Sequence, residues 1–169
     1  MRVRPSRLRL PKIIGALLIM TIVAPPVRGM QPSSYASQPS PALAPLAVVE
    51  AQLAALKAGN VQRCFAFASP NNKRNTGPWQ RFEMMVRQTP AYAPLVSCSS
   101  FEVVSGLAVG TGRWRCRVKV RPAGSSSAPF AVVEPVLFYD WCLSLQDEEP
   151  CSGCWMVDSV MPDRGVIES

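Results

Sequence analysis

The stretch SSFEVVSGLAVGTGRWRCRVKVR, residues 99–121, alternates apolar and polar side chains on both sides of a Gly-Thr-Gly sequence. A period of two residues is typical of strands with one buried face. A type II′ turn with Gly110 first would close a hairpin that sets Lys119 opposite Glu102. The predicted inward positions of this hairpin are Phe101, Val103, Ser105, Leu107, Val109, Trp114, Cys116, Val118 and Val120.

Two further strands are predicted after this hairpin. In FAVVEPVLFYDWCLSL (130–145) the alternation places Val133, Leu137, Tyr139, Trp141 and Leu143 inward. Glu134 and Asp140 then face outward, with Glu134 near Arg117, and Pro135 requires a bulge or an edge position. In CWMVDSV (154–160) the inward residues are Trp155, Val157 and Ser159, and Asp158 faces outward.

Helices are predicted before the strands. In LAVVEAQLAALKAGN (46–60) one apolar face carries Leu46, Val49, Leu53 and Leu56, and Gly59 and Asn60 act as a stop signal. A short second helix buries Val61, Phe65 and Ala68, and it should end at Ser69 because Pro70 disfavours helical geometry before it.

A polar loop, NNKRNTG (71–77), is expected next, with Thr76 capping a third helix that begins near Pro78. The buried side of this helix carries Trp79, Phe82, Met85 and Val86. The predicted fold is therefore α+β, with three N-terminal helices packed on a curved four-stranded antiparallel sheet. It occupies residues 43–163 as a single domain, followed by a tail at 164–169.

The N-terminal 42 residues have the composition of a targeting segment. They contain six of the 18 Lys and Arg residues and no acidic residue, so most of the net charge of +7 belongs to them. Basic residues precede an apolar run at 13–24, which is shorter than the roughly 20 residues that span a bilayer. Residues 1–42 are thus expected to be a targeting segment with a disordered Pro/Ser-rich linker.

Three interpretations fit this segment. A secretory signal peptide fits the order of charge and apolar run, and an organellar transit peptide fits the Arg-rich, acid-free composition. The long Ser/Ala-rich linker favours a plastid address over a secreted one, and a disordered tail without a sorting role is the third reading.

Four short sequences carry a family resemblance: QLAAL (52–56), FAFASP (65–70), FEMMV (82–86) and YAPL (92–95). With the order of helices and strands, they resemble an uncharacterised family within the nuclear-transport-factor-two-like superfamily, which includes the SnoaL-like domains. The resemblance covers about residues 45–161. It implies a cystatin-like cone with an internal pocket, and it supplies no known activity or catalytic residue.

The chain lacks histidine, which excludes Ser-His and Cys-His nucleophiles and most catalytic zinc sites. It also lacks a Gly-rich phosphate loop and a paired-carboxylate motif. The sequence therefore predicts no catalytic residue, metal site or cofactor.

The CSGC sequence, Cys151 to Cys154, is the most specific motif of the chain. The predicted strand pairing sets Cys142 diagonally from Cys154, a marginal distance for a disulfide. Three readings stay open: a local disulfide or thiol pair that stiffens the loop, small residues in a hairpin, and a redox or metal function. Cys98 and Cys116 lie too far apart in the hairpin to form a disulfide.

Five basic residues alternate along one strand: Arg113, Arg115, Arg117, Lys119 and Arg121. They fit either an acidic or phosphate-bearing partner or a solvated strand face that Glu102 and Glu134 partly neutralise. No aromatic residues interleave with them, which argues against nucleic-acid binding.

The sequence favours a non-catalytic module that binds a small apolar ligand or a protein partner. The predicted pocket residues are Phe82, Met85, Ser105, Trp114, Cys116, Tyr139, Trp141 and Ser159. The alternatives are a SnoaL-like isomerase or cyclase that uses a pocket carboxylate, and a thiol redox-sensing domain. No stable membrane span is expected in the mature chain. A homodimer formed through the sheet is also compatible with the sequence.

Overall fold

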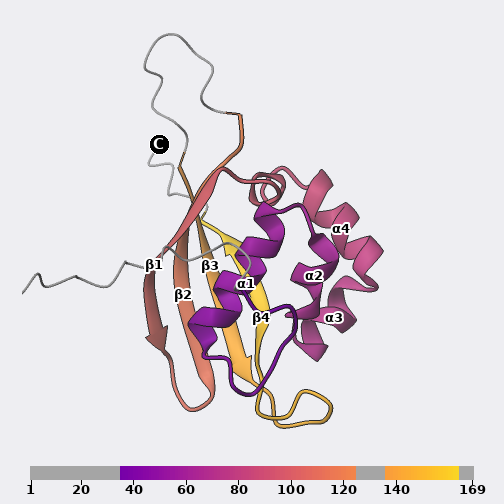
Figure 1. Ribbon diagram of the computed structural model, residues 1–169, viewed down its shortest axis with the longest axis vertical. Coiled ribbons are helices and arrows are strands. Elements are labelled where there is room, and N and C mark those ends of the chain that lie inside the picture. The colour runs from indigo at the N-terminus through magenta and orange to yellow at the C-terminus, as the bar shows by residue number, and fades with distance from the viewer. Residues whose placement is uncertain (1–34, 125–135, 164–169) are drawn as a thin grey trace, which may run out of the picture. The chain divides into compact units, whose positions relative to one another are not determined.

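The computed structural model describes residues 35–124 and 136–163, which form an α+β fold (Figure 1). The helices are α1 (Pro45–Lys57), α2 (Val61–Ala66), α3 (Pro70–Thr76), α4 (Trp79–Gln88) and the 3-10 helix η1 (Ala93–Leu95). The strands are β1 (Ser100–Ala108), β2 (Arg113–Arg121), β3 (Leu137–Leu145) and β4 (Trp155–Pro162). The predicted order, helices first and then four strands, is confirmed, with one α-helix more than the three predicted and the 3-10 helix η1 in addition.

The four strands form an open antiparallel sheet in the order β1-β2-β3-β4. Figure 1 shows α1 lying across one face of this sheet. The segment between α2 and α3 pairs with the outer edge of β4, because Ser69 N donates to Val157 O and Val157 N donates to Phe67 O, both at 2.9 Å. This short parallel pairing places the start of α3 beside β4.

Helix α1 is confirmed, and it is buried on more than the predicted face. Its buried residues are Val48, Val49, Ala51, Gln52, Leu53, Ala55 and Leu56. Leu46, predicted to be buried, lies in the first turn and is exposed. Because α1 contacts both the sheet and α2, it buries nearly its whole circumference after that turn.

The predicted loop at 71–77 is wrong, since Pro70–Thr76 forms α3. Ser69 caps this helix by accepting a hydrogen bond from Asn72 N, and Pro70 fits the first helical position, where its missing N–H costs nothing. Thr76 donates to Asn72 O at the end of α3 and does not cap α4. In α2 the buried residues are Val61 and Cys64, and Phe65 is only half-buried.

The β1–β2 hairpin has the predicted register at one end only. Glu102 pairs with Lys119 as predicted, but a bulge at Val104 shifts every later pair by one residue. The connection is a three-residue loop, since Val109 N donates to Arg113 O, so the predicted two-residue turn is wrong. Beyond the bulge, Gly106 and Ala108 pair with the inward Cys116 and Trp114.

This shift reverses the predicted orientation at the end of β1. Ser105, Leu107 and Val109 were assigned inward, yet all three are exposed, Leu107 to 65%. Trp114 instead packs over Gly106, where an added Cβ would lie 2.4 Å from its Cζ2 atom. The absent side chain therefore makes space for the indole.

The inward positions of β3 are confirmed from Leu137 onward, and Val133, Glu134 and Pro135 lie outside the described residues. Asp140, not Glu134, is opposite Arg117. A bulge at Asp158 interrupts β4, so that Leu143 pairs with Val157 but Cys142 pairs with Ser159 and Trp141 with Val160. Val160 consequently takes the core-facing position predicted for Ser159.

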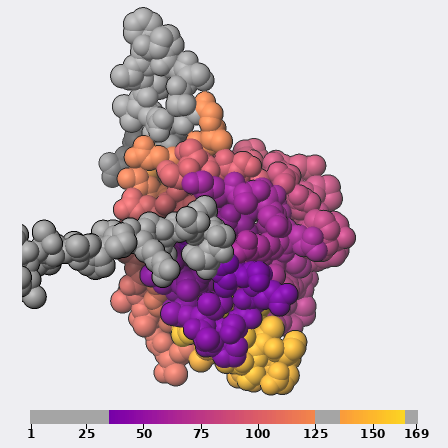
Figure 2. Space-filling view, in the orientation of Figure 1, coloured from indigo at the N-terminus to yellow at the C-terminus, as the bar shows by residue number. Residues whose placement is uncertain are grey.

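Residues that precede the predicted domain boundary at residue 43 contact the helices and the β3–β4 loop. Arg63 Nη2 donates to Tyr35 O at 2.7 Å and to Ala36 O at 2.8 Å, and both residues pack against the core. Pro41 lies beside Gly153 in the β3–β4 loop. Figure 2 shows these first described residues, in indigo, next to the yellow C-terminal part of the chain.

Candidate functional site

A cavity of about 250 Å³ lies between α1, α4 and β4. Its apolar lining comes from the helices and the sheet: Leu56 of α1; Cys64 of α2; Phe82, Met85 and Val86 of α4; Leu95 of η1; and Trp141, Val157, Val160 and Met161 of the sheet. Met85 and Met161 are partly exposed and lie at its rim. Methionine side chains adapt their shape readily, which suits a rim that admits apolar groups.

A buried polar pair forms part of the cavity wall. Gln52 of α1 is only 3% exposed, and its Oε1 accepts a 2.7 Å hydrogen bond from Trp141 Nε1. Its Nε2 donates to Cys64 O at 3.2 Å. Because both ends of the amide are engaged, Gln52 fixes the Trp141 indole against α1.

Two other polar side chains of the lining donate hydrogen bonds to the backbone. Tyr92 OH donates to Val160 O at 3.1 Å, and Asn72 Nδ2 donates to Val157 O at 3.1 Å. Thr89 and Ser159 add hydroxyl groups to the lining. The cavity therefore offers a few polar atoms for orientation within mainly apolar walls, as small-molecule sites do.

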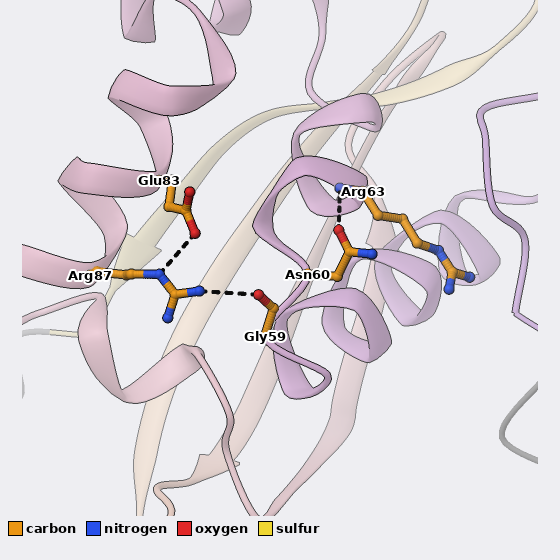
Figure 3. A network of polar contacts seen from close by, with 5 residues as sticks. All are labelled: Gly59, Asn60, Arg63, Glu83 and Arg87. Carbon is orange, nitrogen blue, oxygen red and sulfur yellow. Dashed lines mark hydrogen bonds and ion pairs between the residues drawn. The ribbon is translucent and has the colours of Figure 1, made fainter.

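Helix α4 is held in place by a network that Figure 3 shows. Arg87 Nε pairs with Glu83 at 3.0 Å on the same helix, and Arg87 Nη2 donates to Gly59 O at 3.1 Å. Asn60 caps α2 by accepting from Arg63 N. The α1–α2 turn is thus tied both to α4 and, through Arg63, to the N-terminal segment.

Two ionisable groups near the cavity have raised pKa values, and one carboxylate belongs to its lining. Burial raises the pKa of the Cys64 thiol far above its usual range, so it stays protonated. Burial also raises the pKa of Tyr139 to about 12, and its hydroxyl donates to Ala91 O. Asp158 contributes to the lining, but Ser144 donates a 3.0 Å hydrogen bond to its carboxylate.

Four of the predicted pocket residues line the cavity and four do not. Phe82, Met85, Trp141 and Ser159 line it. Ser105 is exposed on β1 because of the bulge, and Trp114, Cys116 and Tyr139 pack in the core outside the lining. Sequence reasoning missed Gln52, Asn72, Thr89 and Tyr92, of which Gln52 had a signal, as a polar residue inside an otherwise apolar helix.

The cysteines are all free thiols. Cys142 is opposite Ser159, five residues from Cys154 along β4, which is about 16 Å in an extended strand. The predicted diagonal contact with Cys154 is therefore wrong, and Arg115 Nε instead donates to Cys142 Sγ at 3.2 Å. Within the described residues, no group of three or more His, Cys, Asp or Glu side chains could hold a metal ion.

The basic residues of β2 have local partners. Arg117 pairs with Asp163 and lies over the Phe138 ring at 5.1 Å, and Lys119 lies 3.9 Å from Glu102. These contacts favour the reading of a solvated, partly neutralised strand face. Among the described residues, no helix is long and apolar enough to cross a membrane.

A family model described as a domain of unknown function (DUF4864) matches residues 43–114. The matched part runs from just before α1 to the first residues of β2, and it supplies the helical walls of the cavity but not Trp141, β4 or the CSGC loop. Neither the curated proteins nor the solved structures gave a match. The chain therefore contains a DUF4864 domain of unknown function at residues 43–114.

Proposed function

We propose that the domain is a non-catalytic module that binds a small, mainly apolar ligand in the cavity between α1, α4 and β4. The observation that carries this proposal is the composition of the cavity: apolar side chains from helices and sheet, with an engaged Gln52–Trp141 pair and a few hydroxyl groups. Mainly apolar walls with a few polar groups that fix orientation are typical of sites that bind small molecules.

Binding of 2-naphthol to the purified protein, followed by calorimetry, tests this proposal. This probe has a flat apolar body and one hydroxyl group. We expect saturable one-to-one binding with a negative heat-capacity change, because apolar surface is buried. The absence of saturable binding for 2-naphthol and for indole would overturn the proposal.

Two neighbouring methionines provide a matched pair of variants. Met85 lines the cavity and Met84 does not, although they are 42% and 51% exposed on the same helix. Met85→Trp should fill the rim and weaken binding by about tenfold or more, which corresponds to about 1.4 kcal/mol. Met84→Trp should bind as the unmodified protein does. Equal losses of affinity in the two variants would show that the ligand binds outside this cavity.

The second candidate is an isomerase- or cyclase-type enzyme, and the presence of Asp158 in the cavity lining favours it. In this candidate Asp158 is the general base and the bulge in β4 exposes it to the ligand. The two candidates differ in the effect of Asp158→Asn. If the domain only binds a ligand, the Asp158→Asn variant keeps the affinity for 2-naphthol and neither protein shows turnover. If the domain is an enzyme, the variant loses turnover of a substrate that the unmodified protein converts.

The finer fold assignment is also a proposal. Helices followed by an antiparallel meander support a cystatin-like cone of the nuclear-transport-factor-two-like superfamily, with the sheet curved around the cavity. We also propose that residues 1–42 carry the targeting information, with a plastid address favoured over secretion. Expression of this segment fused to a fluorescent protein in plastid-containing cells tests the address.

A further inference from the structure

A second cavity, of about 290 Å³, shares no lining residue with the first. Both cysteines of the CSGC loop line it, together with Lys73 of α3. Gln38 and Pro39 of the N-terminal segment and Met156 of β4 contribute to its walls. Two thiols and a cation therefore open onto one space, on a part of the fold outside the ligand cavity.

The loop holds the two cysteines at a separation suited to a disulfide. Cys154 N donates to Cys151 O at 2.9 Å, which closes a four-residue turn. Such turns bring their first and last Cα atoms within about 7 Å, and disulfides need about 4.4–6.8 Å. Gly153, with φ at +77°, supplies the left-handed residue of the turn.

Two backbone hydrogen bonds connect the turn to Gln146, the residue that follows β3. Gly153 N donates to Gln146 O at 2.8 Å, and Gln146 N donates to Cys154 O at 2.9 Å. Since these bonds use backbone atoms, a bond between the two sulfur atoms leaves the strands in place. The loop is therefore suited to both the reduced and the oxidised form.

The two thiols differ in their surroundings. Cys154 is only 5% exposed, and burial raises its pKa, as do the neighbouring Cys151 and Glu149. Cys151 is more exposed and lines the same cavity as Lys73. Burial lowers the pKa of Lys73, and the neighbouring Cys151 partly offsets this shift. Lys73 Nζ is held by a 3.0 Å hydrogen bond to Ala66 O and lies over the Phe65 ring. The amino group of Lys73 is therefore fixed on the cavity wall that it shares with the more accessible thiol.

We propose that Cys151 and Cys154 form a dithiol site that reacts with disulfides of small thiols, with Cys151 as the attacking thiol and Cys154 as the resolving thiol. With glutathione disulfide, the Cys151 thiolate attacks one sulfur atom, forms a Cys151–glutathione bond and releases one glutathione thiolate. Cys154 then gives its proton to solvent and attacks Cys151 Sγ, which forms the Cys151–Cys154 bond and releases the second glutathione thiolate. The protein loses two electrons and the glutathione disulfide gains them.

The remaining cysteines do not compete for this role. Cys64, Cys98 and Cys116 are buried, and burial raises the pKa of each thiol, so they react slowly. Cys142 is half-buried but lies on β3 opposite Ser159, far from either cysteine of the loop. Because Cys142 has no second loop thiol within reach, the formation of an internal disulfide should be confined to the CSGC loop.

Incubation of the full chain with glutathione disulfide, followed by intact and peptide mass measurement, tests the site. The unmodified protein should lose two hydrogens in a bridge between Cys151 and Cys154. Cys154→Ser should instead accumulate a glutathione adduct on Cys151, and Cys151→Ser should form neither product. An adduct mainly on Cys142, or no product while the circular dichroism spectrum is native, would overturn the proposal.

The contribution of Lys73 is measured with a matched variant on the same helix. Lys73→Met should slow alkylation of Cys151 by iodoacetamide at pH 7 by about fivefold, because the cavity wall that holds Cys151 loses its positively charged side chain. Arg74 is exposed and does not line this cavity, so Arg74→Met removes the same charge from the same helix and should leave the rate within about twofold of the original. Equal rates for the two variants would show that Lys73 does not activate Cys151, and would overturn its part in the site.

Discussion

The Trp141 indole N–H donates a 2.7 Å hydrogen bond to the Gln52 side chain, which joins the sheet to α1 across 89 positions of the sequence. Both groups are buried, so neither has water as an alternative partner. The pair therefore couples the stability of the fold to the shape of the cavity between α1, α4 and β4.

Replacement of Gln52 by Leu should destabilise the protein by about 1–3 kcal/mol, because Trp141 Nε1 and Cys64 O each lose a partner while they stay buried. Urea unfolding measures this change. Gln62→Leu, on the exposed side of α2, is the matched control and should change the stability by about 0.5 kcal/mol or less. Equal effects of the two variants would contradict the assigned role of Gln52.

Replacement of Gly106 by Ala should displace the Trp114 indole, since the added Cβ would lie 2.4 Å from Cζ2. We expect a loss of about 1–3 kcal/mol from overpacking and a change in tryptophan emission as the ring moves. Ser105→Ala, at the neighbouring exposed position, should alter neither quantity. Unchanged emission and stability in the Gly106→Ala variant would show that Trp114 does not pack over this glycine.

Replacement of Arg63 by Leu should free the segment that begins at Tyr35, because both backbone bonds from Nη2 are lost. Limited proteolysis should then cut between residues 35 and 42 much faster than in the unmodified protein. Arg81→Leu removes an exposed arginine from α4 and should leave the cleavage rate unchanged. Equal protection in both variants would mean that the core contacts of Tyr35 and Ala36 hold the segment without Arg63.

The pKa of Tyr139 predicts a loss of stability at alkaline pH. Burial raises this pKa from 10.0 to about 12, so above pH 10 the unfolded state releases the phenol proton more readily than the folded state. The stabilising contribution is complete below pH 10 and should be lost as the pH rises towards about 12. Tyr139→Phe should show a shallower decline in unfolding free energy over this interval, and an identical slope would contradict the assignment.

The sequence was informative where structure depends on local periodicity. The spacing in α1 and the alternation in β3 predicted both elements and the burial of Val49, Tyr139, Trp141 and Leu143. Ser69-Pro70 was read as the end of a helix, although the same pair also begins one, as a cap followed by proline at the first position. The Ser-Pro sequence is compatible with both the end and the start of a helix, and the pairing of this segment with β4 determines which of the two forms.

The errors at the candidate sites came from the details of strand pairing. The bulge at Val104 removed Ser105 from the predicted pocket, and the register of β3 with β4 sets Cys142 opposite Ser159, away from Cys154. An alternating pattern does not reveal where one residue leaves the ladder or which residues of two strands are opposite each other. Much of the cavity was likewise hidden, since Asn72 reaches it through the packing of α3 against β4, and Thr89 and Tyr92 lie in the connection between α4 and η1.

The Val104 bulge and the Gly110–Gly112 loop are the two places where the hairpin tolerates a change of length. Val104 opposes no residue of β2, and Thr111 lies between Val109 and Arg113, which close the loop. Deletion of either residue leaves the pair of Glu102 with Lys119 in place, so related chains should gain or lose each of them independently. Deletion of a paired residue such as Ser105 would instead turn the side chains on one side of it to the opposite face of the sheet.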